Sequence, residues 1–390
     1  MITPLTDVRQ VRAASTAVAV VFGLNGFALA SWFARVPAAR DALGLDAGGL
    51  GLLLLALSAG SVSAMLTAGV VAHRLGVRRA VVRSTAALAA ALVVIGCAVG
   101  AWPSVPGTAA GLFALGYGSG VCNVAMNVEA AAVERALGRT VMPRFHGVWS
   151  LGTIAAAGTA ALAATAALPV TAHLAAVAAT TLTGTVVAAR SFRYGGGGAR
   201  RGTGGVLAAW REPRTLLIGL LVLVLAFAEG TANDWLAVAF VDGHAFSPAA
   251  GAVVFGVFVT TMTLGRVVGP AALDRWGRVP VLLCTMSFAA AGVAVAVLSG
   301  SPAPAVLGVA LWGLGTSLGF PVGMSAAADD DPERAAARVG VVALIGYTAF
   351  LAGPPVVGLL GRHVGVLHAL LVVPVLLVPA LALVPVLRRR

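Results

Sequence analysis

The chain is built from long apolar runs separated by short segments that contain arginine, glycine or proline. A helix needs about 20 apolar residues to cross the roughly 30 Å hydrocarbon core of a bilayer. Twelve runs satisfy this length, near residues 15–35, 49–72, 80–100, 107–128, 146–166, 170–190, 214–240, 249–272, 279–299, 303–326, 339–360 and 366–386. Because lipid offers the backbone no hydrogen-bond partners, we expect helices and not strands.

A short basic turn occurs twice, as His73 to Arg78 and again as Asp274 to Arg278, about half the chain apart. Each copy lies between two apolar runs. The duplication predicts two similar membrane halves joined head to tail. We therefore expect an all-α membrane protein of twelve helices in two pseudo-symmetric halves. Its expected parts are an N-terminal half at 1–190, a cytoplasmic linker rich in glycine and arginine at 191–213, and a C-terminal half at 214–390.

Composition excludes a water-soluble fold and gives an orientation. Apolar residues make up 59% and charged residues 10%, against about 25% charged in soluble domains. All 26 basic residues are arginine, and with the N-terminus inside only Arg35, Arg40 and Arg362 fall outside. This bias predicts cytoplasmic N- and C-termini in a bacterial cytoplasmic (inner) membrane. The net charge of +12 then reflects topology, and nucleic-acid binding is not expected.

Motifs for enzyme chemistry are missing from the sequence. The three cysteines lie in apolar runs, the six histidines are scattered, and no Walker loop or dinucleotide fingerprint occurs in a supporting context. We expect no catalytic residues, no metal site and no cofactor. A transporter of this kind would draw its energy from the proton gradient.

Two acids lie inside an apolar run, where a charged side chain costs roughly 2.5–3.5 kcal/mol on insertion scales. Glu229 follows the apolar stretch 216–228, and Asn233 lies one turn further on the same face. Glu229 either handles the coupling proton or substrate, or is a protonated acid bonded to a neighbouring helix. Asp234 is a second proton-coupling candidate, unless it reaches the outer interface.

Further polar residues mark the deep parts of other runs. Asn123 and Asn127 are one helical turn apart and could face a cavity or join two helices. Asn25 and Tyr347 are also deep. Trp312 could line a cavity or act as an interfacial anchor. We expect Asn25, Asn123, Asn127, Asn233, Trp312 and Tyr347 to bind substrate.

A charged cluster is expected at the inner ends of the fourth and fifth runs. Glu134 would join Arg135 and Arg139 there, with His146 close by. His146 could relay a proton, although its place at the start of the fifth run favours an interfacial role.

Twelve spans, a long central inner loop and the duplicated turn together resemble the major facilitator superfamily. Residues 69–79 are similar to its loop motif, glycine-x-x-x-aspartate-arginine-x-glycine-arginine, with His73 at the aspartate position, whereas the second copy keeps Asp274. In the superfamily this acid helps to hold the inner gate. The resemblance therefore implies an inner gate, unequal between its two halves, that includes His73, Arg74, Arg78, Asp274, Arg275, Arg278, Glu134, Arg139 and His146.

A narrower resemblance is to poorly characterised bacterial inner-membrane members near the fucose-permease-like sugar transporters. It rests on residues 123–127, 133–152, 229–235 and 350–355. Those relatives often have aspartate where this chain has Asn123. Hallmarks of proton-driven drug exporters are missing, since Leu112 stands where their fourth-span arginine would fall.

The sequence thus predicts a secondary transporter, proton-coupled and working by alternating access, for a small sugar-like or otherwise hydroxylated solute. No arginine is expected deep in the membrane that could bind a strongly anionic solute. One alternative is a proton-driven exporter of a drug or natural product. Another is a non-transporting membrane sensor, which the short tails disfavour. The expected partners are the small-molecule substrate, protons and the lipid bilayer, and we expect a monomer.

Overall fold

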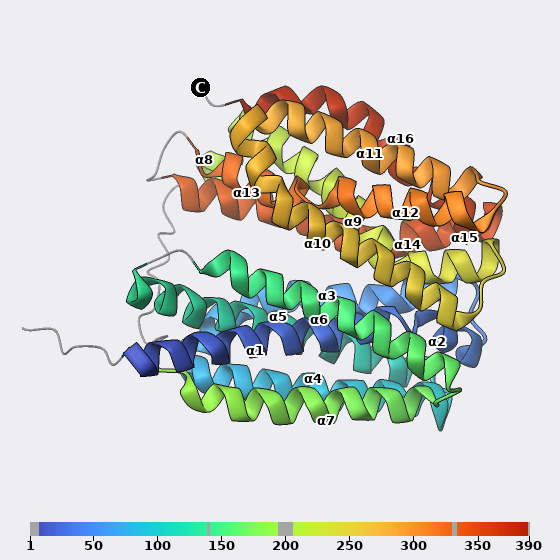
Figure 1. Cartoon of the computed structure of the whole chain (residues 1–390), viewed down its shortest axis with the longest axis horizontal. Helices are drawn as coiled ribbons and strands as arrows, with labels where there is room; N and C mark the ends of the chain where they lie inside the picture. The colour runs from blue at the N-terminus through green and yellow to red at the C-terminus, as the bar shows by residue number, and fades with distance from the viewer. Residues whose placement is uncertain (1–7, 139–140, 194–205, 330–333, 389–390) are drawn as a thin grey trace, which may run out of the picture. The chain divides into compact units, whose positions relative to one another are not determined.

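The structure is a computed structural model that describes residues 8–138, 141–193, 206–329 and 334–388. Every regular element in these ranges is a helix (Figure 1). Twelve helical segments of the described chain are long and apolar enough to cross a membrane. They fall on the twelve runs predicted from the sequence, so the predicted twelve-helix membrane fold is confirmed.

The N-terminal part of the described chain contains the elements from α1 to η1, and the C-terminal part contains those from α8 to η2. The first set is α1 (Val8–Phe33), α2 (Val36–Leu43), α3 (Ala47–Leu75), α4 (Val77–Gly100), α5 (Val105–Leu137), α6 (Met142–Thr165), α7 (Val170–Ala188) and the 3-10 turn η1 (Ala189–Ser191). The second set is α8 (Val206–Ala209), α9 (Pro213–Gly243), α10 (Pro248–Trp276), α11 (Arg278–Leu298), α12 (Pro302–Thr316), α13 (Gly319–Ala327), α14 (Ala335–Val364), α15 (Val366–Ala369), α16 (Val372–Ala380) and the 3-10 helix η2 (Leu381–Leu387). The short helix α2, between the first two spans, was not predicted.

The duplicated basic turn has the same backbone geometry in both copies. Gly76 separates α3 from α4 with φ +76°, and Gly277 separates α10 from α11 with φ +79°. Residues with a side chain rarely adopt a positive φ, so glycine permits the abrupt change of direction. The repeated sequence therefore encodes a repeated helix-turn-helix corner.

Two of the later spans are divided into shorter pieces. The span 302–327 consists of α12 and α13, which are interrupted at Ser317 and Leu318. The final span consists of α15, α16 and η2, and prolines lie inside both α16 and η2. Proline has no N–H and crowds the preceding turn, which breaks the regular bonding of a helix.

The chain forms two compact units, one made of Met1–Gly44 with Ala56–Ala199 and the other of Leu45–Leu55 with Arg200–Arg390. In the first unit α1 packs with α6 and α7, and α4 packs with α5 and α7. In the second, α9 packs with α14 and α10, and α11 packs with α12. The helix α9 has the largest buried share among the candidate spans.

Residues Leu45–Leu55, which include the first turns of α3, belong to the second unit, where they pack with α14. The α3 backbone approaches so closely that a Cβ on Gly358 would lie 2.6 Å from the Ala47 carbonyl oxygen. Beyond this contact, Arg362 pairs with Asp46, with Nε 2.8 Å from Oδ2. Gly358 thus allows this close backbone contact, and the exposed Arg362–Asp46 ion pair lies next to it.

Candidate functional site

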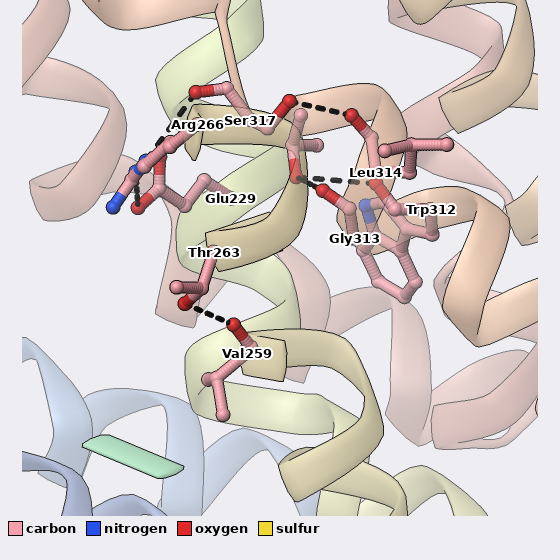
Figure 2. A network of polar contacts seen from close by, with 9 residues as sticks. Glu229, Val259, Thr263, Arg266, Trp312, Gly313, Leu314 and Ser317 are labelled. Atoms are coloured by element: carbon pink, nitrogen blue, oxygen red, sulfur yellow. Dashed lines mark hydrogen bonds and ion pairs between the residues drawn. The ribbon is translucent and has the colours of Figure 1, made fainter. Parts of the chain in front are cut away.

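An ion pair joins α9 and α10 within the second unit. The Nη2 atom of Arg266 lies 3.0 Å from Oε1 of Glu229, and both side chains are largely buried (Figure 2). Glu229 was predicted to lie deep in its span, whereas Arg266 was counted among the inner arginines. The expectation that no deep arginine exists is therefore wrong. The opposite charge is also why the two side chains can be buried together, since a lone buried charge is far more costly.

The guanidinium of Arg266 makes a second contact, at the break between α12 and α13. Its Nε donates to the carbonyl oxygen of Ser317 at 3.3 Å (Figure 2). In a regular helix that carbonyl would accept from the N–H four residues later, which here is Pro321 and has none. Pro321 thus frees the Ser317 carbonyl for Arg266. Pro270, four residues after Arg266, removes the equivalent bond within α10.

Asp234 differs from Glu229 in having no cation beside it. It is 8% exposed, and no ion pair or hydrogen bond to its side chain is found within the described residues. It lies five positions after Glu229 on the same helix, α9. The helix α9 therefore carries one paired and one unpaired acid, about 140° apart around the helix axis.

The other predicted residues of the second unit have different surroundings. Tyr347 is half-buried and packs against the rings of Phe320 and Phe350. Asn233 is half-buried on α9. Trp312 is fully buried and packs edge-on against Phe258, with ring centroids 5.6 Å apart. In this structure Trp312 is thus a core residue and lines no open surface, unlike the expectation.

In the first unit the predicted asparagines divide between two roles. Asn25 is 3% exposed and joins α1 to α5: Ser119 Oγ donates to its Oδ1 at 2.9 Å, and its Nδ2 donates to the Ser119 carbonyl at 3.4 Å. This places Asn25 in an interhelical bond. Asn127 Nδ2 donates to Asn123 Oδ1 at 3.1 Å within α5, on an accessible face. Asn123 and Asn127 therefore keep the geometry for meeting a solute.

The charged cluster expected around Glu134 is replaced by a helix cap. Glu134 Oε2 accepts from the backbone N–H groups of Val141 and Met142, each at 2.7 Å, at the start of α6. Orphan N–H groups at a helix start favour a carboxylate. The ring of His146 lies edge-on to Phe22. Arg139 lies outside the described residues.

The two basic turns differ in their contacts. Arg278 pairs with Asp329, and its Nη2 donates to Ser325 Oγ at 2.8 Å, so the second turn is tied to the end of α13. Asp274 is exposed and has no ion-pair partner in the described ranges. Arg275 lies over the ring of Trp276, 5.4 Å from its centroid.

His73, Arg74 and Arg78 of the first turn are exposed. Arg278, and not the motif acid Asp274, therefore makes the observed ion pair of the second turn.

Sequence reasoning missed Arg266 and Ser317. One signal was available, because Arg266 lies six residues inside the predicted span 249–272. Ser317 offered another, since a proline follows it by four residues and leaves its carbonyl open. That the two would meet could not be read from the sequence.

Comparison with known proteins identifies relatives over most of the chain. No family model matches. An uncharacterised MFS-type transporter of Yersinia pestis is 32% identical over 344 residues, covering 88% of each chain. An uncharacterised transporter of Sinorhizobium fredii is 30% identical and covers 88% of this chain and 90% of its own. Membrane protein MosC of Rhizobium meliloti is 29% identical, and the match covers 91% of this chain and 86% of MosC.

Solved structures agree with the fold. A variant of the nucleoside transporter NupG superposes with a TM-score of 0.81 at 13% identity and covers 96% of this chain and all of its own. The Escherichia coli fucose:proton symporter FucP gives a TM-score of 0.63 at 13% identity, covering 96% and 98%. With the relatives in sequence, these findings show that the chain belongs to the major facilitator superfamily and is a multi-pass membrane transporter, not an enzyme.

Proposed function

We propose that this transporter moves a small, uncharged, hydroxylated solute across the bacterial cytoplasmic membrane together with protons, by alternating access. The observation that supports this most directly is the pairing of Glu229 with Arg266, together with the unpaired Asp234 on the same helix. The pair supplies hydrogen-bonding groups with no net charge. The second acid leaves one group available for a proton.

The neutral charge of the pair supports the solute class. A guanidinium alone would favour an anion, but here Glu229 already neutralises it. Asn123, Asn127 and Asn233 add amides that can both donate and accept. NupG is titled a nucleoside transporter and FucP a fucose:proton symporter. Nucleosides and fucose are both neutral and rich in hydroxyl groups, which is in line with this proposal.

Asp234 is the proposed site of proton coupling. An isolated carboxylate inside a membrane protein is costly, so gain and loss of a proton at Asp234 would change the energy of the site substantially. Glu229 differs because Arg266 stabilises its charge. No further cofactor is required, since the proton gradient would supply the energy. The proposal includes cytoplasmic termini and a monomeric transporter.

Proteoliposomes containing the purified protein and a pH-sensitive dye test the proposal. Addition of uridine or fucose should move protons, whereas gluconate or a lipophilic cation should not. Asp234→Asn should abolish solute-driven proton movement while solute counterflow continues. Asp242→Asn, an exposed acid on the same helix, is the matched control and should behave as the unaltered chain.

Two results would contradict it. Unchanged proton movement in Asp234→Asn would remove that residue from coupling. A response to the lipophilic cation alone would favour an exporter of drugs or natural products.

A further inference from the structure

A buried arginine without an acidic partner lies at the end of α1 in the first unit. Arg35 is 4% exposed, and its Nη2 donates to the Leu168 carbonyl oxygen at 2.6 Å. Its Nε has no acceptor, and no carboxylate forms an ion pair with it within the described residues. The nearest acid along the α2 segment, Asp41, is bonded to Arg40. Burying an unpaired charge costs several kcal/mol, so Arg35 requires a source of negative charge.

Two more unpartnered side chains accompany Arg35. His173 is 4% exposed, and neither ring nitrogen has a partner within the described residues. Trp32 is fully buried one turn before Arg35, and its indole N–H has no acceptor. Buried polar groups are nearly always hydrogen-bonded. A ligand that accepts hydrogen bonds would satisfy Arg35 Nε, which is buried without an acceptor.

The start of α7 adds positive potential at the same place. Leu168, which binds the guanidinium, immediately precedes the N-cap Pro169, and no side chain caps this helix. The first N–H groups of a helix lack partners within it and attract anions. His173 lies in the first turn of α7. Arg35 therefore lies at the start of α7, the helix whose first turn carries His173.

From these contacts we propose that Arg35, His173 and the start of α7 bind one small inorganic anion, of the size and charge of chloride. One uncompensated guanidinium calls for one negative charge. Arg35 and His173 are each only 4% exposed, which favours a small ion over a lipid headgroup. The site lies within the first unit and does not include the Glu229–Arg266 pair, so it is separate from the proposed transport chemistry.

Chloride binding to the full-length protein in detergent tests the site. Radiolabelled chloride should bind saturably, and replacing gluconate with chloride at constant ionic strength should raise the melting temperature by about 2–4 °C. Arg35→Gln should lose both effects. Arg40→Gln removes a nearby arginine that is already paired with Asp41, so it should retain them.

A milder variant keeps the test decisive if Arg35→Gln does not fold. His173→Phe removes the ring nitrogens and keeps an aromatic ring. His173→Phe should weaken chloride binding by about ten-fold, as expected for a lost hydrogen bond to a charge. The proposal is overturned if the unaltered protein binds no chloride, or if Arg35→Gln or His173→Phe binds it as well as the unaltered chain.

Discussion

The Nη2 atom of Arg266 lies 3.0 Å from Oε1 of Glu229, and this contact links two neighbouring helices of the second unit. The same guanidinium reaches the Ser317 carbonyl at the break between α12 and α13. One side chain thus connects an acid, a helix break and the helix α10 on which it lies. A change at any of the three should affect the other two.

Removing one side chain of the Glu229–Arg266 pair should destabilise the protein more than its share of the loss when both are removed. Arg266→Gln or Glu229→Gln leaves a charge without its partner, which should lower the free energy of unfolding by about 1–3 kcal/mol. The double variant should lose less than the sum of the two, because no lone charge remains. The free energy of unfolding of the two single variants and the double variant can be measured in detergent. Additive losses would show that the two side chains do not interact in solution.

Pro321→Ala should weaken the contact between Arg266 and Ser317. An alanine N–H at position 321 can bond to the Ser317 carbonyl and join α12 to α13. The restored hydrogen bond should raise the free energy of unfolding by about 1 kcal/mol. Solute uptake should fall, because Arg266 loses an acceptor. Pro302→Ala, at the first position of α12, is the control and should leave uptake unchanged. An unaltered uptake rate in Pro321→Ala would argue against a role for the break.

Asn25→Ala should lower stability, whereas Asn127→Ala should mainly lower solute uptake. Asn25→Ala leaves the buried Ser119 hydroxyl without its acceptor, at a cost of about 1–3 kcal/mol in unfolding free energy. Asn127→Ala loses bonds only within its own helix, and its stability should change by no more than about 0.5 kcal/mol. Uptake should nevertheless fall in Asn127→Ala if that amide meets the solute. Equal losses of stability would contradict the division between a packing and a binding asparagine.

Acidic pH should weaken the N-terminal end of α9 through Glu212. Hydrogen bonds from Arg338 and Thr215 hold the pKa of this carboxyl below its ordinary value of 4.5. The lowered folded value means that the contacts stabilise the protein above pH 4.5 and are lost as the pH falls through the lowered pKa. Melting curves from about pH 7 to about pH 3 should show a loss that Glu212→Gln lacks. Identical pH profiles in both proteins would refute this.

Two glycines of α14 offer a matched pair. A Cβ on Gly358 would meet the Ala47 carbonyl oxygen at 2.6 Å, whereas a Cβ on Gly340 would meet nothing within 4 Å. Gly358→Ala should therefore destabilise the second unit by about 1–3 kcal/mol. Gly340→Ala should stabilise it by about 0.5–1 kcal/mol, because alanine favours helix. A neutral Gly358→Ala would show that α3 and α14 can separate at no cost.

Much of the fold could be predicted from local patterns. The twelve apolar runs give the spans, and the repeated basic turn marks two equivalent corners at Gly76 and Gly277. The site was predicted less completely. Glu229 was singled out by its apolar flanks, but Arg266 was assigned to the inner ends because arginine there is common. Glu134 was expected in a charged cluster and instead caps α6.

The sequence by itself determined which segments span the membrane and which acids lie inside them. These properties depend on the composition of about 20 neighbouring residues and on the need to satisfy every backbone group in lipid. Only the tertiary structure decided that Arg266 meets Glu229, that Asn25 meets Ser119 and that Arg35 reaches the start of α7. Such pairings depend on the rotation of each helix about its axis and on neighbours far away in the chain, which no local pattern records.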